Sequence, residues 1–356
     1  LLNSGVSGGI VSLSDLTVLG NLKTRVATVT DPVINPYVQI INSTGTNTVN
    51  KIITFQNTGG EQSYYNITFN GNVICNILIV GGGGGGGRGA YANGGGGGGG
   101  VLYMVNKVFQ KGVTYKVSVG NGGTSAYKGY DSLITYLDDT SVIYDSLELK
   151  GHGGGTWGVS SGSGGSGAGG RNRQGSMTGG LATQGNTFWN GTTYVPGGFN
   201  GGNGATYAGG GGGGAAELGE TDGAQQGGDG RPVDINGTTI LYGGGGGGGG
   251  GGGEGGEDGG GDVVGHGGSA AKNGEPNTGG GGGGAYSYNM GDAGGTGGSG
   301  IVIISYSNEE EIIESYSDDK VENLLANKGG SNITWNIGTK KFDCDVVNTD
   351  VDVSEA

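Results

Sequence analysis

The stretch NILIVGGGGGGGRGAYANGGGGGGG, residues 76–100, decides how the rest of this chain folds. Its apolar segment, residues 77–80, runs directly into seven glycines, and six other residues separate these from seven more. The pattern recurs along the chain, because further glycine runs occupy residues 209–214, 243–253 and 279–284. The last glycine block then leads into the apolar segment 301–306. Any fold for this chain must explain what glycine does between two apolar strands.

Composition leaves two readings of the glycine blocks. Of the 356 residues, 96 are glycine and only five are proline, and the runs have no three-residue period, which excludes collagen. Glycine loses much backbone entropy on folding, so disorder is the first alternative. The blocks nevertheless alternate with short segments rich in Val, Ile, Thr and Tyr, and they lack the Ser, Glu and Lys of a solvated linker. These features favour an ordered arrangement.

Backbone hydrogen bonding explains how glycine runs can be ordered. A polyproline-II-type strand has three residues per turn, rises about 3.1 Å per residue and forms no internal hydrogen bonds, so its polar groups must bond outward. Without side chains, several such strands can pack side by side and bond to one another. We therefore expect residues 81–87 to form one rod, residues 88–93 a reversal and residues 94–100 the return rod. An alanine inside such a slab would hold neighbouring rods apart.

The segments between the glycine blocks predict an all-β chain. Expected strands, separated by Gly, Asn and Thr turns, are residues 37–41, 51–55, 64–69, 73–80, 101–105 and 113–119. Two hairpins are expected, one from residues 132–136 and 141–145 and one from residues 233–234 and 238–242. No segment in the first 300 residues has helical periodicity. The residues therefore predict an all-β chain with glycine inserts. Together with the resemblance given below, they predict a β-sandwich-like frame with inserted, packed polyglycine-II helices.

Composition divides the chain into three parts: a fibre-shaft segment at residues 1–35, a glycine-rich domain at residues 36–306, and the start of another shaft repeat at residues 307–356. The first part carries too little apolar surface to fold alone, so neighbouring chains would have to complete its core. We therefore expect fibrous flanks, and the resemblance given below implies that they are trimeric.

In the last part, residues 316–325 predict a short helix. Residues 333–336 and 341–347 predict a hairpin.

Three pieces of the chain resemble known sequences. The span from Tyr37 to Tyr306 resembles the glycine-rich adhesin domain of phage tail-fibre tips and of fibre-like proteins of large DNA viruses. The residues that carry this likeness are ILIVGGG at 77–83, YKVSVGNGG at 115–123 and GGSGIVII at 297–304. The segment LTVLGNL, residues 16–22, resembles coils of trimeric fibre shafts, and residues 316–343 are similar to a tandem repeat of marine phage and giant-virus fibres.

The resemblance implies that the glycine blocks form packed polyglycine-II helices and that variable loops at the end of the slab contact a host receptor. It also implies a location on the outer surface of a virion. The expected partners are two further copies of this chain, a host surface glycan or protein, and other virion fibre or capsid proteins.

Charge and motifs argue against several other functions. A net charge of −14 opposes nucleic-acid binding, and no run of 18 or more apolar residues could span a membrane. The apolar segment 77–80 is followed by a match to G-x-G-x-x-G in the glycines of residues 81–87. No helix former follows, so we expect no dinucleotide cofactor. The two histidines, His152 and His266, stand alone, which predicts no metal site. The acids of residues 254–262 could bind a cation, although a solvated loop is the favoured reading. We expect no enzymatic activity.

Aromatic residues among glycine and polar residues are the best binding candidates, because Tyr and Trp offer rigid contact area with a polar handle. The alternative for each one is that it seals the slab from water. The receptor-binding candidates, which include two arginines, are Tyr91, Tyr127, Trp157, Arg171, Arg173, Phe188, Trp189, Tyr194 and Tyr286.

The function expected from these observations is a structural and attachment component of a virus fibre. One alternative is a purely structural capsid- or matrix-associated protein with a stiff polyglycine layer. A second, an ice-binding protein, would need a flat face of regular small residues, and the aromatic inserts oppose it.

Overall fold

The computed structural model describes residues 27–30, 39–44, 49–69, 71–89, 91–136, 148–156, 162–172, 178–219, 225–250, 271–287, 293–307, 333–336 and 341–344. Among these residues there are strands and extended segments but no helix, as the sequence predicts. The chain forms two compact units. One is Val26–Ser307, and the other combines Leu1–Arg25 with Asn308–Ala356.

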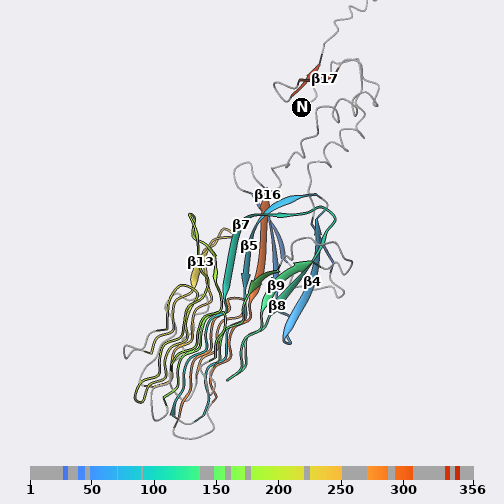
Figure 1. The fold of residues 1–356 in the computed structure, drawn as a ribbon. Coiled ribbons are helices and arrows are strands. Elements are labelled where there is room, and N and C mark those ends of the chain that lie inside the picture. The colour runs from blue at the N-terminus through green and yellow to red at the C-terminus, as the bar shows by residue number, and fades with distance from the viewer. Residues whose placement is uncertain are drawn as a thin grey trace, which may run out of the picture. The chain divides into compact units, whose positions relative to one another are not determined.

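The two largest β-sheets of the larger unit form a sandwich-like frame (Figure 1). The seven-stranded sheet has the order β12-β11-β7-β5-β16-β3-β2. Its strands are β2 (Gln39–Thr44), β3 (Val49–Gln56), β5 (Val73–Val80), β7 (Val101–Phe109), β11 (Asn186–Trp189), β12 (Tyr194–Pro196) and β16 (Ile301–Ser307). The apolar segments on either side of the glycine blocks, β5 and β16, are neighbours and pair antiparallel, with Ile301 opposite Val80.

The second sheet has the order β1-β4-β8-β9-β10. Its strands are β1 (Ala27–Thr30), β4 (Gln62–Phe69), β8 (Thr114–Gly120), β9 (Ser132–Tyr136) and β10 (Glu148–Gly151). Strand β1 lies within the span that composition assigns to the first shaft segment, yet it pairs with β4. The sequence predicts that β9 forms a hairpin with residues 141–145, but in the structure β9 pairs with β10 on one side and β8 on the other. Residues 141–145, which the sequence places opposite β9, lie outside the described residues.

Successive side chains of β5 point to opposite faces of the sheet, and they belong to two separate apolar clusters. Ile77 and Ile79 belong to the cluster shared by the two sheets, which also contains Phe69, Phe109 and Tyr115. Leu78 and Val80 point to the opposite face of the seven-stranded sheet, because successive strand residues alternate. A hairpin of β13 (Arg231–Val233) and β14 (Ile240–Tyr242) contributes to this second cluster and corresponds to the second predicted hairpin. Both faces of β5 are therefore buried along residues 77–80, whereas Ile74 nearer its start is exposed.

The glycine runs leave the sheets as rods that lie side by side and form a slab (Figure 1). Residues 81–87 and 94–100 are buried and antiparallel, and they confirm the predicted rod, reversal and return rod. The N–H groups of Gly81, Gly84 and Gly87 donate to the carbonyls of residues 100, 97 and 94, at 2.9–3.1 Å. A return to the same neighbour every third residue is the period of a polyglycine-II helix.

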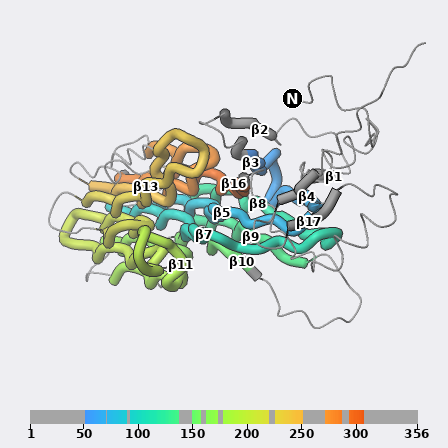
Figure 2. The backbone as a smooth tube through the Cα atoms, turned by 90° about the horizontal axis from the view of Figure 1, so that it is seen from above, coloured from blue at the N-terminus to red at the C-terminus, as the bar shows by residue number. Residues whose placement is uncertain are grey.

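The remaining positions of these rods bond in other directions. In residues 94–100, the N–H groups donate to three different segments: residues 210 and 213, residues 282 and 279, and residues 155 and 152. Their carbonyls accept from the first rod, from residues 166 and 169, and from Gly246. In Figure 2 residues 81–100 run between the green rods and the orange rods, which agrees with this central position. Backbone hydrogen bonds, each worth about 1 kcal/mol net, hold the slab together in every direction across the rods.

The smaller unit contains one described hairpin, β17 (Ile333–Asn336) and β18 (Lys341–Cys344), which confirms the hairpin expected from residues 333–336 and 341–347. The helix predicted for residues 316–325 and the shaft coil at residues 16–22 lie outside the described residues.

Asp131, which directly precedes β9, forms an ion pair with Lys150 on β10 and a hydrogen bond with the segment that follows β10. Asp131 lies 2.8 Å from the Lys150 Nζ atom, and it also accepts a 2.6 Å hydrogen bond from the N–H of Gly153. Burial alone would raise the pKa of this carboxyl, but the Lys150 and Gly153 contacts outweigh burial and lower it. A carboxyl whose folded pKa is below its unfolded pKa stabilises the fold when ionised.

We expect Asp131→Asn to reduce the free energy of unfolding by about 1–2 kcal/mol at pH 7. The stabilisation is complete above the unfolded pKa of about 3.9 and is lost as the pH falls through the lower folded pKa. Urea denaturation of both proteins at pH 7, 4 and 3 should therefore show the two curves converging at low pH. A difference between them that does not change with pH would contradict this role.

Candidate functional site

The structure separates the sequence-predicted binding residues into two places. The first is the distal end of the slab, which we define as the end away from the sheets, with the predicted residues Tyr91, Tyr127, Arg171 and Tyr286. Arg88 and Tyr207, which are not among the residues predicted from the sequence, lie at the same end. The second lies on the seven-stranded sheet, beside β11, and includes Phe188, Trp189 and Tyr194. Trp157 and Arg173 lie outside the described residues.

Backbone pairing positions the distal end. The reversal between the first two rods forms β6 (Tyr91–Ala92), which pairs antiparallel with β15 (Tyr286–Ser287). Asn93 lies fully buried behind it, and its Nδ2 donates to the carbonyls of Gly89 and Ala285 at 3.0 and 2.9 Å. The N–H of Asn172 donates to the carbonyl of Ala92, which brings Arg171 to the same end.

Exposed tyrosines complete this end. The side chain of Tyr127 is 61% exposed and that of Tyr207 is 75% exposed. Tyr207 has a φ of 64° in a turn that the Ala205 and Ala208 backbones close with two hydrogen bonds. Such a strained, left-handed backbone at a large residue is costly, and it holds the ring out into solvent. Arg88 is also exposed.

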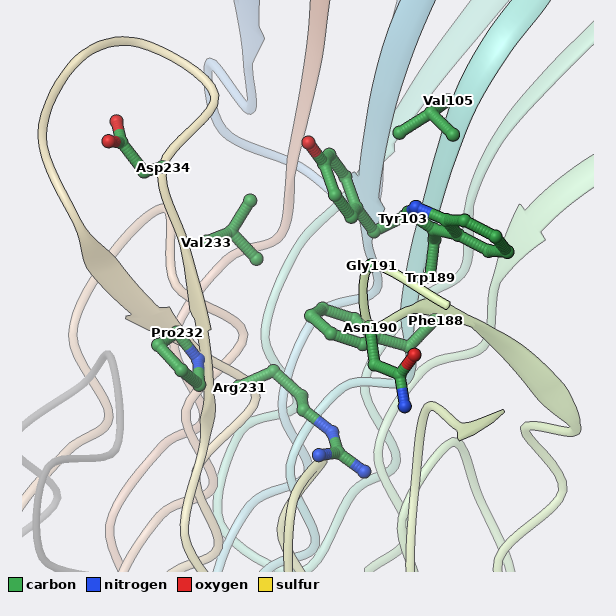
Figure 3. A pocket seen from close by; sticks show the side chains of 10 residues that line it. All are labelled: Tyr103, Val105, Phe188, Trp189, Asn190, Gly191, Arg231, Pro232, Val233 and Asp234. Carbon is green, nitrogen blue, oxygen red and sulfur yellow. The ribbon is translucent and has the colours of Figure 1, made fainter. Parts of the chain in front are cut away.

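The second place is an open groove of about 600 Å³ between the seven-stranded sheet and the β13–β14 hairpin (Figure 3). We call it the side groove, and its lining residues are Tyr103, Val105, Phe188, Trp189, Asn190, Gly191, Arg231, Pro232, Val233 and Asp234. Its volume lies in the range of small-ligand sites.

Aromatic packing builds the inner wall of the side groove. Phe188 on β11 is opposite Tyr103 on β7, and their ring centroids lie 5.7 Å apart. Phe188 is 7% exposed, so most of its area packs in the core. The guanidinium of Arg231 lies 5.1 Å from the Phe188 ring centroid, and its Nε and Nη2 donate to the carbonyls of Ala215 and Pro196. Burial lowers the pKa of Arg231.

Trp189 and Tyr194 form a separate pair. They lie opposite each other on β11 and β12, with ring centroids 5.2 Å apart. Strand alternation places them on the other face of the sheet from Phe188. In Figure 3 the Trp189 ring points away from the hairpin, so this residue contributes only to the rim of the side groove.

Polar groups line the opposite side of the groove. Asp234 follows β13 on the hairpin loop, and Tyr103 extends toward that loop (Figure 3). Burial raises the pKa of Tyr103, and the negative charge of Asp234 raises it further. Sequence patterns did not indicate Tyr103, Arg231 or Asp234 as site residues, because the two hairpin residues lie far along the chain from β7 and only tertiary packing brings them together.

The described residues also bear on metal and membrane sites. They contain no group of three or more His, Cys, Asp or Glu side chains that could hold a metal ion. The acidic residues 254–262 and His266 lie outside the described ranges. In the described part of the chain, no helix is long and apolar enough to cross a membrane.

A family model described as a glycine-rich domain matches residues 57–307, which is more than half of the chain. No curated protein matches the sequence.

Proposed function

The chain belongs to the glycine-rich domain family, and from that premise we propose that it is a non-enzymatic attachment module of a virus fibre. In this proposal the sandwich-like frame anchors the glycine slab, and the distal end of the slab contacts a glycan or protein on the host surface. The module would act on the outer surface of the virion.

The observation that carries the proposal is the hydrogen-bond network of the slab. Because buried rods bond to neighbours in several directions, the distal end is held at a set distance from the frame without a large apolar core. A rigid support reduces the entropy that surface side chains lose on binding. The slab can therefore hold side chains far from the sheets without the loss of binding affinity that a flexible support would cause.

The composition of the distal end supports the same role. It exposes Tyr127, Tyr207 and Arg88, and tyrosine and arginine are enriched at the energetic centres of protein interfaces. Arginine also supplies positive charge in a chain whose net charge is −14. That contrast favours contact with polar or acidic groups of a host surface at this end.

We further propose that the flanks assemble three copies of the chain into a shaft, together with other fibre or capsid proteins. The support is the resemblance of residues 16–22 and 316–343 to fibre-shaft sequences. Light scattering on the whole chain would measure its mass in solution, and a monomer would contradict the trimer.

A purely structural role is the second candidate, and the density of the slab's backbone bonding favours it. A layer of this kind would be stiff and resistant to proteases whether or not its distal end binds anything.

Binding of the labelled chain to intact host-type cells and to a glycan array tests the attachment role. We expect the double substitution of Tyr127 and Tyr207 by Ala to weaken surface binding about tenfold or more, because exposed aromatic residues at a contact centre dominate its affinity. Tyr64→Ala is the matched control, since Tyr64 is 51% exposed but lies on β4 of the frame. Binding that survives the double substitution would contradict recognition through these two tyrosines, and a chain that binds no surface would favour the structural role.

A further inference from the structure

We propose that Asn190 and Asn236 are acceptor sites for N-linked glycans, which would cover one side of the frame and leave the distal end of the slab bare. This is a covalent modification of the frame, so it goes beyond the attachment role proposed above and does not depend on it.

The same tetrapeptide marks both sites. The sequence Asn-Gly-Thr-Thr occupies residues 190–193 and again residues 236–239. Each copy contains the N-x-[ST] pattern of a glycan acceptor, in which a hydroxyl residue follows two positions after Asn. The structure places one copy in the turn directly before β12 and the other in the turn directly before β14. Exposed turns suit this modification, because an attached glycan is bulky and hydrophilic.

The two turns hold the acceptor amide in the same way. Gly191 and Gly237 have left-handed φ angles of 100° and 84°, which glycine adopts without steric cost. In each turn the Asn Oδ1 accepts a hydrogen bond from the N–H two residues on, at 3.0 Å from Thr192 and 3.2 Å from Thr238. The Thr192 hydroxyl also donates to the Asn190 Oδ1, at 3.0 Å. The turns therefore use the amide oxygen, and toward the described residues neither Nδ2, the atom that would carry the glycan, donates a hydrogen bond.

Exposure distinguishes these turns from another copy of the pattern. Residues 190–193 and 237–239 are exposed, and Asn236 is partly exposed. Asn66, which begins the pattern Asn-Ile-Thr, lies instead in the middle of β4, with β1 paired on one side and β8 on the other. The hydroxyl of its Thr68 bonds across the sheet to the hydroxyl of Thr114, at 2.9 Å. We therefore expect Asn66 to be modified in a smaller fraction of molecules than either turn site.

Both turns lie at strand ends that point away from the slab. Strand β7 begins where the rod 94–100 ends, and β11 runs parallel to it, so the turn after β11 lies at the far end. Strand β14 leads directly into the glycine run at residue 243, so the turn before β14 also lies away from the slab. Asn190 and Asp234 line the side groove from the two hairpins (Figure 3). Glycans on both turns would therefore cover this side of the frame.

The modification requires a donor of one chemical class, an oligosaccharide linked through a diphosphate to a membrane lipid. The Asn Nδ2 forms a bond to the anomeric carbon of the sugar, and the bond from that carbon to the diphosphate oxygen breaks. The lipid diphosphate leaves, and the amide nitrogen gives one proton to a base of the transferring enzyme. No atom is oxidised or reduced.

Peptide mass spectrometry of the whole chain, secreted from eukaryotic cells, tests the proposal. Treatment with a glycan-removing amidase in heavy-oxygen water converts each modified Asn to an Asp that carries heavy oxygen. We expect this label at Asn190 and Asn236. A parallel sample without the amidase corrects for spontaneous deamidation, which exposed Asn-Gly sequences also undergo.

The doubled threonines supply matched variants. Thr192→Val and Thr238→Val remove the hydroxyl that the acceptor pattern requires, and we expect them to abolish the label at Asn190 and Asn236, respectively. Thr193→Val and Thr239→Val make the same change one residue later, at exposed positions outside the pattern, and should leave the label unchanged.

Three results would overturn the proposal: no label at either turn of a secreted chain with native circular dichroism, equal loss of label in both sets of variants, or more label at Asn66 than at the turns. The attachment role is measured separately by surface binding through Tyr127 and Tyr207, so either proposal can fail while the other holds.

Discussion

Replacing Gly84 by alanine is expected to reduce the free energy of unfolding by about 3–5 kcal/mol, although it adds one methyl group. An ideal Cβ at Gly84 would lie 1.9 Å from the carbonyl oxygen of Gly155. Both are backbone positions in packed rods, so no flexible side chain can move aside. Relief requires the rods to separate, which also breaks bonds such as the 2.9 Å contact from the Gly84 N–H to Gly97. Urea denaturation followed by circular dichroism measures the loss.

Gly185→Ala is the matched control for this experiment. A Cβ at Gly185 meets nothing within 4 Å, and neither this glycine nor Gly84 has a left-handed φ. The control therefore changes the unfolded chain in the same way but adds no clash, and we expect a change within about 0.5 kcal/mol, toward higher stability. Equal effects of the two substitutions would show that residues 81–87 are not packed as rods.

Phe109→Ala is expected to cost about 3–5 kcal/mol of unfolding free energy, because it leaves a cavity in the cluster between the sheets. Phe109 is fully buried, stacks on Phe69 with ring centroids 5.5 Å apart, and meets Tyr115 edge-on at 4.5 Å. The two residues belong to β4 and β8 of the opposite sheet, so the cavity would weaken the contact that joins the sheets.

Val108→Ala, one position earlier on β7, provides the comparison. Val108 is 47% exposed, and we expect its truncation to change stability by no more than about 0.5 kcal/mol. If both substitutions cost little, the sandwich core would not be the main source of apolar stabilisation.

Thermal denaturation of the slab variant Gly84→Ala and the core variant Phe109→Ala, measured in parallel, would show whether frame and slab unfold together.

Strands β3, β4, β5, β7 and β8 could be predicted because alternating Val, Ile, Tyr and Phe segments end at clear turns. Other elements could not. Strands β11 and β12 lie in a polar segment, and they form because Phe188 and Val195 pack on the sheet. The pairing of β9 with β10 could not be predicted either, because β10 is the short segment ELKG, which has no β-branched or aromatic residue to mark it as a strand.

The candidate site could be predicted in part. The arrangement of Tyr91 and Tyr286 at the distal end follows from the reversal at residues 88–93 together with the pairing of β6 and β15. Phe188 is expected at a surface loop because polar residues surround it in sequence, yet it is 7% exposed in the second cluster. The side groove combines residues from three separate segments, and no local pattern marks such a combination.

The sequence alone determined that a glycine slab is inserted between apolar strands. The slab was predictable because only glycine lets backbones approach closely enough to bond in several directions. The strands were predictable because their apolar residues alternate with period two. The rod, reversal and return rod at residues 76–100 follow from that chemistry. Tertiary structure alone decided which rods are neighbours. Polyglycine carries no side chain to specify a partner, so the order of rods is set by where the sheets and turns place each run. The same long-range packing created the side groove from Tyr103, Asn190 and Asp234.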